Sequence, residues 1–238
     1  LEFALSDYCI AQMAKALGKT TDYEDLMRRA KNYRYLYNPK TKLFQARNAD
    51  GCWAGEHSGF TEGANWTYQF CVMQDVQGLI DLMGGDESFA AALDNVFDNG
   101  HYRHDNEPGH HYVYLYNYCG RFDKAQERIP EILDTHYRNG ADGLSGNEDC
   151  GQMSAWYVFS ALGFYPVTPA SGEYALGIPR FPSARVELPH GKVLTVRAEG
   201  LKEHKHLPVI LFNGKKLDAP FIAIRDLMKG GVLEFKAE

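Results

Sequence analysis

The sequence Gly-Asn-Glu-Asp-Cys-Gly-Gln-Met-Ser-Ala-Trp occupies residues 146–156 and joins a polar turn to an apolar segment. Two adjacent carboxylates, Glu148 and Asp149, stand between the two glycines, and an apolar run with helical spacing follows. Polar groups at the start of a helix suit a cleft better than a core, because the helix N-terminus carries partial positive charge. The stretch therefore predicts a helix over 152–163 with a polar site at its start.

Two more polar turns lie upstream, each beside a predicted helix. Thr-Glu-Gly-Ala-Asn-Trp occupies residues 61–66, and Asn-Glu-Pro-Gly-His-His occupies residues 106–111. Carboxylates that are well separated along the chain suit cleavage of a glycosidic bond, which needs one acid and one base. An ordinary acid at a helix N-terminus is an equally good interpretation of Glu62 taken alone, and a solvated turn acid is the favoured interpretation of an arbitrary pair such as Glu148 and Asp149.

The neighbours of these acids favour a sugar site. Asn147 and Gln152 offer hydrogen bonds beside the Glu-Asp pair, and Trp156 offers an apolar wall for a sugar ring. Trp66, close to the upstream acid, is a second candidate ring contact, although its ring would also suit a core.

The turn at Asn106 and Glu107 carries oxygen ligands that suit a calcium ion, with carbonyl groups and waters completing the coordination. The following pair, His110 and His111, lacks the HExxH spacing of a zinc site. Adjacent histidines rarely share one metal. Neutral histidines that donate hydrogen bonds to sugar hydroxyls are therefore the preferred interpretation.

Helical periodicity runs from residue 1 to about residue 165. Apolar residues recur at helical spacing over 5–17, and Thr21 with Glu24 has the spacing of a capping box for a second helix through residue 35. Short links between the helices predict antiparallel hairpins, as in a bundle or part of an α/α toroid. Further helices are predicted over residues 65–83, 86–97 with Asp86 as its cap, 108–119 and 122–138.

Beyond Pro166 the pattern changes to short β-like runs. The Asn213-Gly214 pair is a strong hairpin signal. The fold class is therefore mainly α, with residues 1–168 forming the helical domain and 169–238 forming a β-rich segment that completes a sandwich whose other sheet lies elsewhere. The β runs cover residues 184–188, 193–197, 209–212 and 232–235.

Composition excludes several classes of function. A net charge of −6 provides no basic surface for nucleic acid, and no apolar segment has the ~20 residues of a membrane span. The 5 cysteines show no CxxC spacing. The sequence contains no P-loop, Rossmann or GxSxG motif. Leu1 falls inside a predicted helix without a preceding cap, which predicts a fragment of a longer protein.

The chain resembles the C-terminal portion of the bacterial α-mannosidases of glycoside hydrolase family 92. The run over residues 146–166 is long and specific, and the similarity continues more weakly into the β-rich segment. The other segments that carry the resemblance are 1–4 with Asp7, 61–63, 75–80, and 106–108 with the two histidines.

The resemblance implies part of an (α/α)6 toroid, joined in the whole protein to an N-terminal β-sandwich that this chain lacks. It implies a calcium-dependent, inverting exo-α-mannosidase that acts on mannose-containing glycans, at α-1,2 or related linkages, outside the cytoplasm of a bacterium. Glu62 matches the general acid and Asp149 the general base, while Asn106 and Glu107 match positions that help to hold calcium. The residues expected to contact the sugar are Trp66, His110, His111 and Asn147.

The sequence also departs from the family pattern. Asn147 stands where some members have a second aspartate, and Gln74 occupies a place often held by histidine. The connection over 97–106 is shorter than usual, which leaves the linkage preference open. The alternative is a non-catalytic carbohydrate-binding or scaffold module on the same fold. A lyase or phosphorylase is a third possibility.

Overall fold

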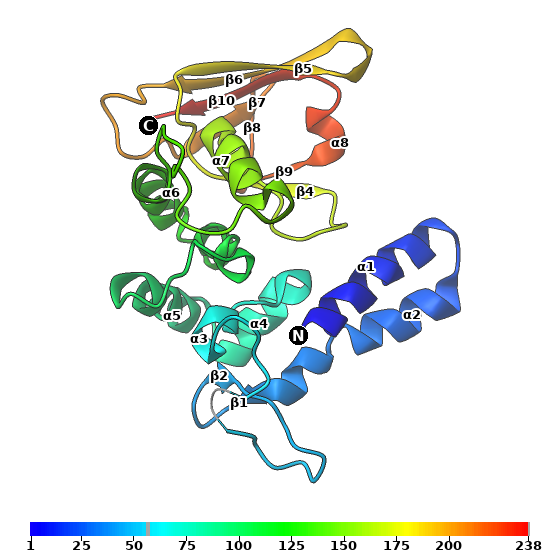
Figure 1. Ribbon diagram of the computed structural model, residues 1–238. Coiled ribbons are helices and arrows are strands. Elements are labelled where there is room, and N and C mark those ends of the chain that lie inside the picture. Colours follow the sequence, from blue (N-terminus) through cyan, green and yellow to red (C-terminus); the bar gives the residue numbers. More distant parts are fainter. Residues whose placement is uncertain (56–57, 238) are drawn as a thin grey trace. The chain divides into compact units, whose positions relative to one another are not determined.

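The structure is a computed structural model of the 238-residue chain and describes residues 1–55 and 58–237. This part of the chain divides into two compact units, whose elements are labelled in Figure 1. The first unit contains Leu1–Arg103 and Thr168–Ser171, and the second contains His104–Val167 and Gly172–Glu238. The sequence-based division at residue 168 stays a prediction.

The first unit begins with a helical hairpin of α1 (Glu2–Ala16) and α2 (Thr20–Arg29). Gly18 in the link has a φ of +70°, which glycine adopts without steric cost. Arg29 on α2 donates to the buried Asp7 of α1, with N–O distances of 2.8 and 3.0 Å. This paired contact links the two helices. Both predicted helices are therefore present, although their ends differ from the prediction.

The ends of the second helix differ from the prediction. Lys19 is its N-cap and makes no side-chain cap bond, so the expected capping box at Thr21 and Glu24 is wrong. The helix ends at Arg29 and is followed by a separate 3-10 helix, η1 (Asn32–Leu36), and by the short hairpin of β1 (Tyr37–Asn38) and β2 (Leu43–Phe44).

The single helix predicted over 65–83 is also wrong, because the chain breaks into three pieces. Asp75 has a φ of −148°, and its side chain accepts a hydrogen bond of 3.1 Å from the amide of Gly78. A new helix therefore starts after Asp75 instead of continuing. The pieces are α3 (Asn65–Tyr68), η2 (Met73–Asp75) and α4 (Val76–Met83), and α5 (Asp86–Asp98) follows with Gly85, not Asp86, as its N-cap.

The second unit holds the last predicted helices. The segment predicted as a helix over 108–119 is built from 3-10 turns, and nearly every side chain of its longer turn is buried. A segment buried on all sides has no polar face, so its helical type cannot be inferred from periodicity. The elements are η3 (Glu107–Gly109), η4 (Tyr112–Cys119), α6 (Phe122–His136), η5 (Asp149–Gly151) and α7 (Gln152–Leu162).

Two sheets complete the second unit. One has the strand order β5-β6-β10-β7-β8, in which β6 and β10 are parallel and the other pairs are antiparallel. Asn213 and Gly214 form its predicted tight turn, with φ of 51° and 78°. The second sheet, β3-β4-β9, lies in the same unit and escaped the sequence analysis. The strands are β3 (Phe164–Tyr165), β4 (Glu173–Leu176), β5 (Ser183–Leu188), β6 (Lys192–Glu199), β7 (Val209–Phe212), β8 (Lys215–Lys216), β9 (Phe221–Ala223) and β10 (Gly231–Lys236), with η6 (Pro189–Gly191) and α8 (Ile224–Leu227) between them.

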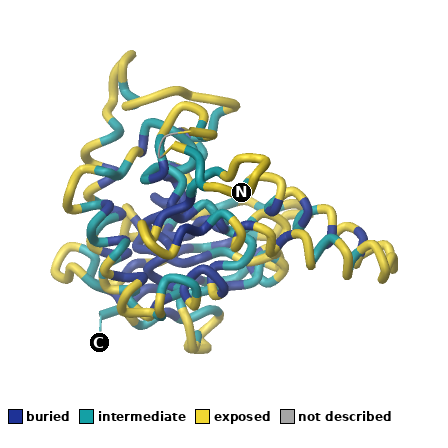
Figure 2. Tube along the Cα trace, turned by 90° about the horizontal axis from the view of Figure 1, so that it is seen from below, coloured by how far each residue is buried: buried dark blue, intermediate teal, exposed yellow. Residues whose placement is uncertain are grey.

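Each unit has buried apolar residues, and Figure 2 colours all buried residues dark blue. The largest buried side chains of the second unit are aromatic, and the ring of Tyr114 on η4 contacts those of Trp156 on α7 and Tyr165 on β3. Among residues 1–55 and 58–237, no helix has the length and apolar character needed to cross a bilayer. The aromatic interior matters for the site because the polar turns lie directly on it.

Candidate active site

The two polar turns of the second unit touch through their backbones. A Cβ atom built on Gly146 would lie 2.5 Å from the Cα and 2.6 Å from the Cβ of Asp105, and closer still to its carbonyl oxygen. Only a glycine permits this approach. Asn147 follows Gly146 and Asn106 follows Asp105, so the turn bearing the Glu-Asp pair lies beside the turn bearing Asn106 and Glu107.

This contact predicts a strong effect of one methyl group. Gly146→Ala should lower the free energy of unfolding by about 1–3 kcal/mol, because an overpacked contact forces the backbone to move. Gly140→Ala is the matched control, since its Cβ would meet only the flexible side chain of Asp142 at 3.2 Å. Urea unfolding of the full-length protein measures both. Equal stability of the two variants would contradict the close backbone contact.

Within the Glu-Asp pair the two carboxylates have different surroundings. Glu148 Oε1 accepts a hydrogen bond of 3.1 Å from the amide of Ser154 in the first turn of α7, so Glu148 caps this helix. Asp149 is exposed at the start of η5. The next residue, Cys150, has a φ of 53°, a left-handed conformation that is unusual for a non-glycine residue. Both acids are exposed, but Glu148 is held by its bond to α7, whereas Asp149 stands on a sharp turn.

The second turn contains an unsatisfied carboxylate oxygen. Asn106 caps η3 by accepting a hydrogen bond of 3.1 Å from the amide of Glu107. Glu107 Oε1 is buried and has no hydrogen-bond partner. A buried carboxylate oxygen without a donor is unfavourable unless a cation or another donor reaches it. The side-chain oxygens of Asn106 and Glu107 are ligands of the kind that a hard cation such as calcium prefers.

The acidic and basic side chains alone do not form a complete metal cage. In the described part of the chain, no group of three or more His, Cys, Asp or Glu side chains is arranged to hold a metal ion. Calcium accepts carbonyl and water oxygens as well as carboxylates. Glu107 and Asn106 would therefore supply a minority of its ligands.

The two predicted sugar-binding histidines are buried beneath these turns. His110 Nε2 lies 3.0 Å from the carbonyl oxygen of His104, so this nitrogen carries the proton. Its Nδ1 then accepts, and the amide of Gln152 lies 3.5 Å away. Burial lowers the pKa of His110, which keeps the ring neutral. His111 is also buried. Both stay predicted sugar contacts, and His110 is visibly engaged within the protein.

Trp156 does not form the expected apolar wall. Its side chain is fully buried, and its Nε1 donates to the carbonyl of His110 at 2.8 Å. Tyr137 stacks on it with an interplanar angle of 3°, and His104 meets it edge-on. Burial, the dominant cause, together with the neighbouring His110 and His136, lowers the pKa of His104 to about 2. Trp156 therefore stabilises the segment around His110 from the interior of the unit.

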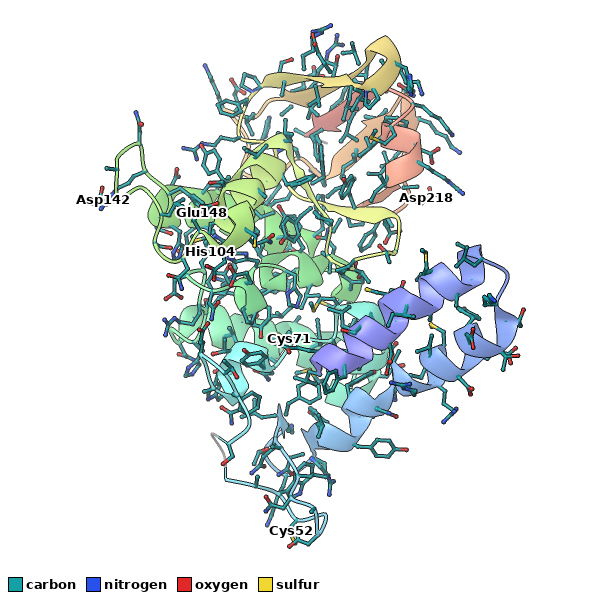
Figure 3. The ribbon with its side chains drawn as sticks, turned by 45° about the vertical axis from the view of Figure 1, so that its right-hand side comes forward. Cys52, Cys71, His104, Asp142, Glu148 and Asp218 are labelled. Atoms are coloured by element: carbon teal, nitrogen blue, oxygen red, sulfur yellow. The ribbon has the colours of Figure 1, made fainter. Side chains whose placement is uncertain are left out.

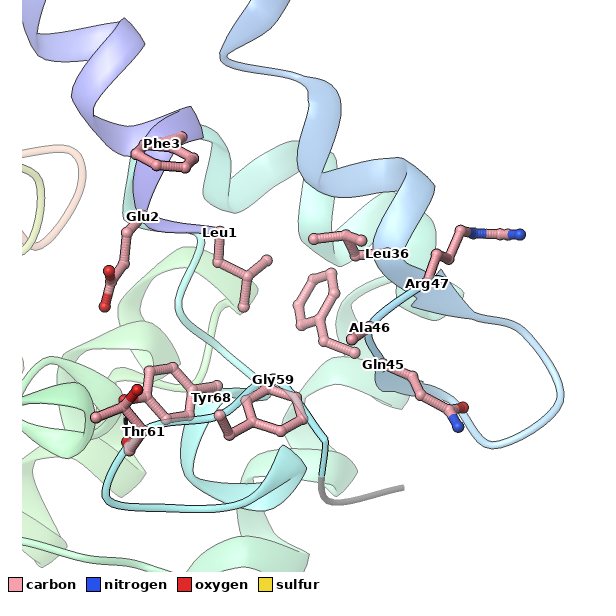
Figure 4. A pocket seen from close by; sticks show the side chains of 12 residues that line it. Leu1, Glu2, Phe3, Leu36, Gln45, Ala46, Arg47, Gly59, Thr61 and Tyr68 are labelled. Carbon is pink, nitrogen blue, oxygen red and sulfur yellow. Dashed lines mark hydrogen bonds between the residues drawn. The ribbon is translucent and has the colours of Figure 1, made fainter. Parts of the chain in front are cut away.

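The remaining predicted residues, Glu62 and Trp66, belong to the first unit. Glu62 is exposed, with a φ of 54°. The hydroxyl of Tyr68 donates to the carbonyl of the preceding Thr61 at 2.6 Å, which holds this loop. Thr61 and Tyr68 line a cavity of about 370 Å³, drawn in Figure 4. Trp66 stacks on His101, with ring centroids 4.3 Å apart.

The structure thus brings together part of the predicted site. Asn106, Glu107, Asn147 and Asp149 lie on two touching turns of one unit, whereas Glu62 and Trp66 lie in the other. The convergence of Glu62 and Asp149 on one sugar stays a prediction. Sequence reasoning missed His101, His104 and Tyr137, because no local pattern links them to the predicted site residues.

Comparison with known proteins identifies the family. The model described as "Glycosyl hydrolase family 92 catalytic domain" matches residues 1–238. The chain therefore belongs to glycosyl hydrolase family 92. Its helical part and the sheet-containing C-terminal part agree with the solved members described below.

Two solved structures from Bacteroides thetaiotaomicron are similar over nearly the whole chain. The family GH92 alpha-mannosidase BT3965 is 40% identical with a TM-score of 0.92, and the match covers 99% of this chain and 33% of that protein. The inverting mannosidase BT2199 is 35% identical with a TM-score of 0.90, covering 98% and 36%. An "uncharacterized secreted glycosidase" of Arthroderma benhamiae is 27% identical, covering 98% and 34%. The chain spans about a third of the length of these relatives.

Proposed function

We propose that this chain is part of a calcium-dependent, inverting exo-α-mannosidase that removes terminal mannose from glycans. Membership of family 92 and the names of the solved relatives support an α-mannosidase. One of these relatives has been solved with mannoimidazole. The observation that supports the proposal here is the contact of Gly146 with Asp105, because it joins the turn that carries the exposed Asp149 to the turn that carries the unsatisfied Glu107.

In this proposal Asp149 is the general base and takes a proton from the water that attacks the anomeric carbon. Glu62 is the general acid and protonates the departing oxygen on the opposite face of the sugar. An inverting pair needs carboxyl groups roughly 6.5–9.5 Å apart, so that the water fits between base and sugar. Asn147, His110, His111 and Trp66 are proposed to contact the sugar.

Asn106 and Glu107 would hold calcium, and the buried Glu107 Oε1 supports this assignment. When bound, the ion would supply positive charge that helps to bind the mannose and favours a distorted sugar ring. Without the ion, the Asn106 side chain already stabilises this turn by accepting a hydrogen bond from the amide of Glu107.

The proposal extends to the whole protein. The helices would form the C-terminal part of an (α/α)6 toroid, preceded by an N-terminal β-sandwich, which the threefold greater length of the solved relatives supports. The substrates would be glycans with α-1,2 or related linkages, including N-glycans. A relative named as secreted supports a place outside the cytoplasm.

The test is to follow hydrolysis of α-mannosides by the full-length protein with NMR. An inverting enzyme releases β-mannose first, before mutarotation. Release of α-mannose first would overturn inversion. Binding of mannose without turnover would instead favour the non-catalytic carbohydrate-binding module.

Replacing Glu107 by Gln should weaken calcium binding by roughly 10–100-fold, because the oxygen stays but the charge is lost. Calorimetric titration of the chelator-treated protein with calcium measures the affinity. Glu148→Gln is the matched control, since Glu148 caps α7. Equal calcium affinity of both variants would remove Glu107 from the ligand set.

A further inference from the structure

A chain of hydrogen bonds links the two touching turns to the end of α6. The hydroxyl of Tyr137, the residue that follows α6, donates to the carbonyl of Met153 in the first turn of α7 at 3.0 Å. His104 Nε2 lies 2.6 Å from the same hydroxyl. A phenol has one proton, and Met153 takes it, so the imidazole must be the donor to Tyr137. One hydroxyl thus joins two segments of the site.

The same segments are joined a second time. His110 donates to the carbonyl of His104 at 3.0 Å, and Trp156 of α7 donates to the carbonyl of His110 at 2.8 Å. His104, His110 and Trp156 are each at most 1% exposed. The ring of Tyr137 stacks on Trp156 at 5.9 Å. The bonds form a closed circuit from α7 to the turn and back, in which Tyr137 is half-buried. His104, one member of the circuit, is labelled in Figure 3.

The circuit includes His110, a proposed sugar contact, but it does not include Asp149, the proposed base. His104 immediately precedes Asp105, which Gly146 contacts. Met153 lies in the first turn of α7, directly after the η5 turn that contains Asp149. A shift of α7 relative to His104 would therefore move Asp149 relative to Glu107. Hydrogen bonds specify such a register more sharply than ring packing, because they weaken steeply with distance and angle.

We propose that Tyr137 is a positioning residue, whose hydroxyl fixes the Asp149 turn against the Asn106–Glu107 turn through His104 and Met153. The inference rests on the proposed function, since it assigns Tyr137 a role in placing the base. Tyr137 does not act on the substrate itself. Its contribution is the geometry of the attack, for which a misplacement of about 1 Å can cost ~10²-fold in rate.

The experiment compares Tyr137→Phe with Tyr157→Phe in the full-length protein. Tyr157 lies on α7, and its ring contacts that of Tyr137 at 5.1 Å. Tyr137→Phe should lower kcat by roughly 10–100-fold and change KM less than about 3-fold, because the sugar still binds while the base is misplaced. Tyr157→Phe should retain the wild-type kcat. A kcat of Tyr137→Phe within 2-fold of wild type, whatever its stability, would overturn the proposal, as would a loss explained by KM alone.

A second pair of variants tests the link from its other end, even if Tyr137→Phe does not fold. The amide of His104→Gln reaches the place of Nε2 and can donate to Tyr137, whereas the shorter His104→Asn cannot. The glutamine variant should retain at least about 10 times the kcat of the asparagine variant. Equal values would show that the bond to Tyr137 does not set the rate.

Asp149→Asn, assayed in parallel, separates this inference from the proposed function. If Asp149→Asn is inactive while Tyr137→Phe behaves as wild type, only the positioning role is lost. If Asp149→Asn turns over normally, the base assignment and the positioning role fail together.

Discussion

Asp149→Asn is expected to reduce kcat on α-mannosides by roughly 10²- to 10⁴-fold, the usual contribution of a general base. The amide is nearly isosteric, so binding and folding should change little. Because the water loses its proton acceptor on every substrate, the loss should be similar for good and poor leaving groups. Steady-state kinetics on a series of aryl mannosides measures this effect.

Glu148→Gln provides the control for this substitution, since it alters the adjacent residue. Glu148 caps α7 through the amide of Ser154, and glutamine keeps an oxygen for that bond. We expect a loss of at most about 1 kcal/mol in the free energy of unfolding and a kcat close to wild type. Hydrolysis that survives in Asp149→Asn and disappears in Glu148→Gln would exchange the roles of the two acids.

Glu62→Gln is expected to have an effect that depends on the leaving group. An acid that protonates the departing oxygen matters most when that oxygen is basic, as in a disaccharide. We expect roughly 10²- to 10⁴-fold slower hydrolysis of mannobiose and a much smaller loss with activated aryl mannosides. Plots of log kcat/KM against leaving-group pKa should be steeper for the variant than for the wild type.

Glu87→Gln is a suitable control for Glu62, because Glu87 is an exposed acid in the first turn of α5 in the same unit. It should leave both substrates unaffected. Equal slowing of Glu62→Gln on activated and unactivated substrates would contradict the acid assignment and point to a general effect on binding or folding.

Elements with a strong periodic pattern were predicted from the sequence alone. The helices α1, α6 and α7 agree with their apolar spacing, and the strands β5, β6, β7 and β10 agree with their β-like runs. The helix over 65–83 was mispredicted because the Asp75 side chain competes for the amide of Gly78. This competition depends on a local backbone turn that apolar spacing does not record. The strands β3 and β9 are short, and β9 pairs with β4, which lies far from it in sequence.

The candidate site was predicted as far as its turns. Glycine, acid and amide residues close together in sequence indicated the turns around Asp149 and Glu107. The supporting circuit was missed because its bonds join residues far apart in sequence, such as His104 with Tyr137, 33 positions later. The contact of Gly146 with Asp105 was missed for the same reason, since a glycine in sequence indicates flexibility as readily as close packing.

The left-handed backbone at Cys150 has a consequence for attempts to stabilise the protein. A non-glycine residue in this region costs on the order of 1 kcal/mol or more, so Cys150→Gly would relieve an unfavourable conformation in the folded chain. The same change would give the backbone directly after Asp149 more conformational freedom. Selection for thermal stability at this position would therefore raise the stability of the fold while making the position of Asp149 less well defined.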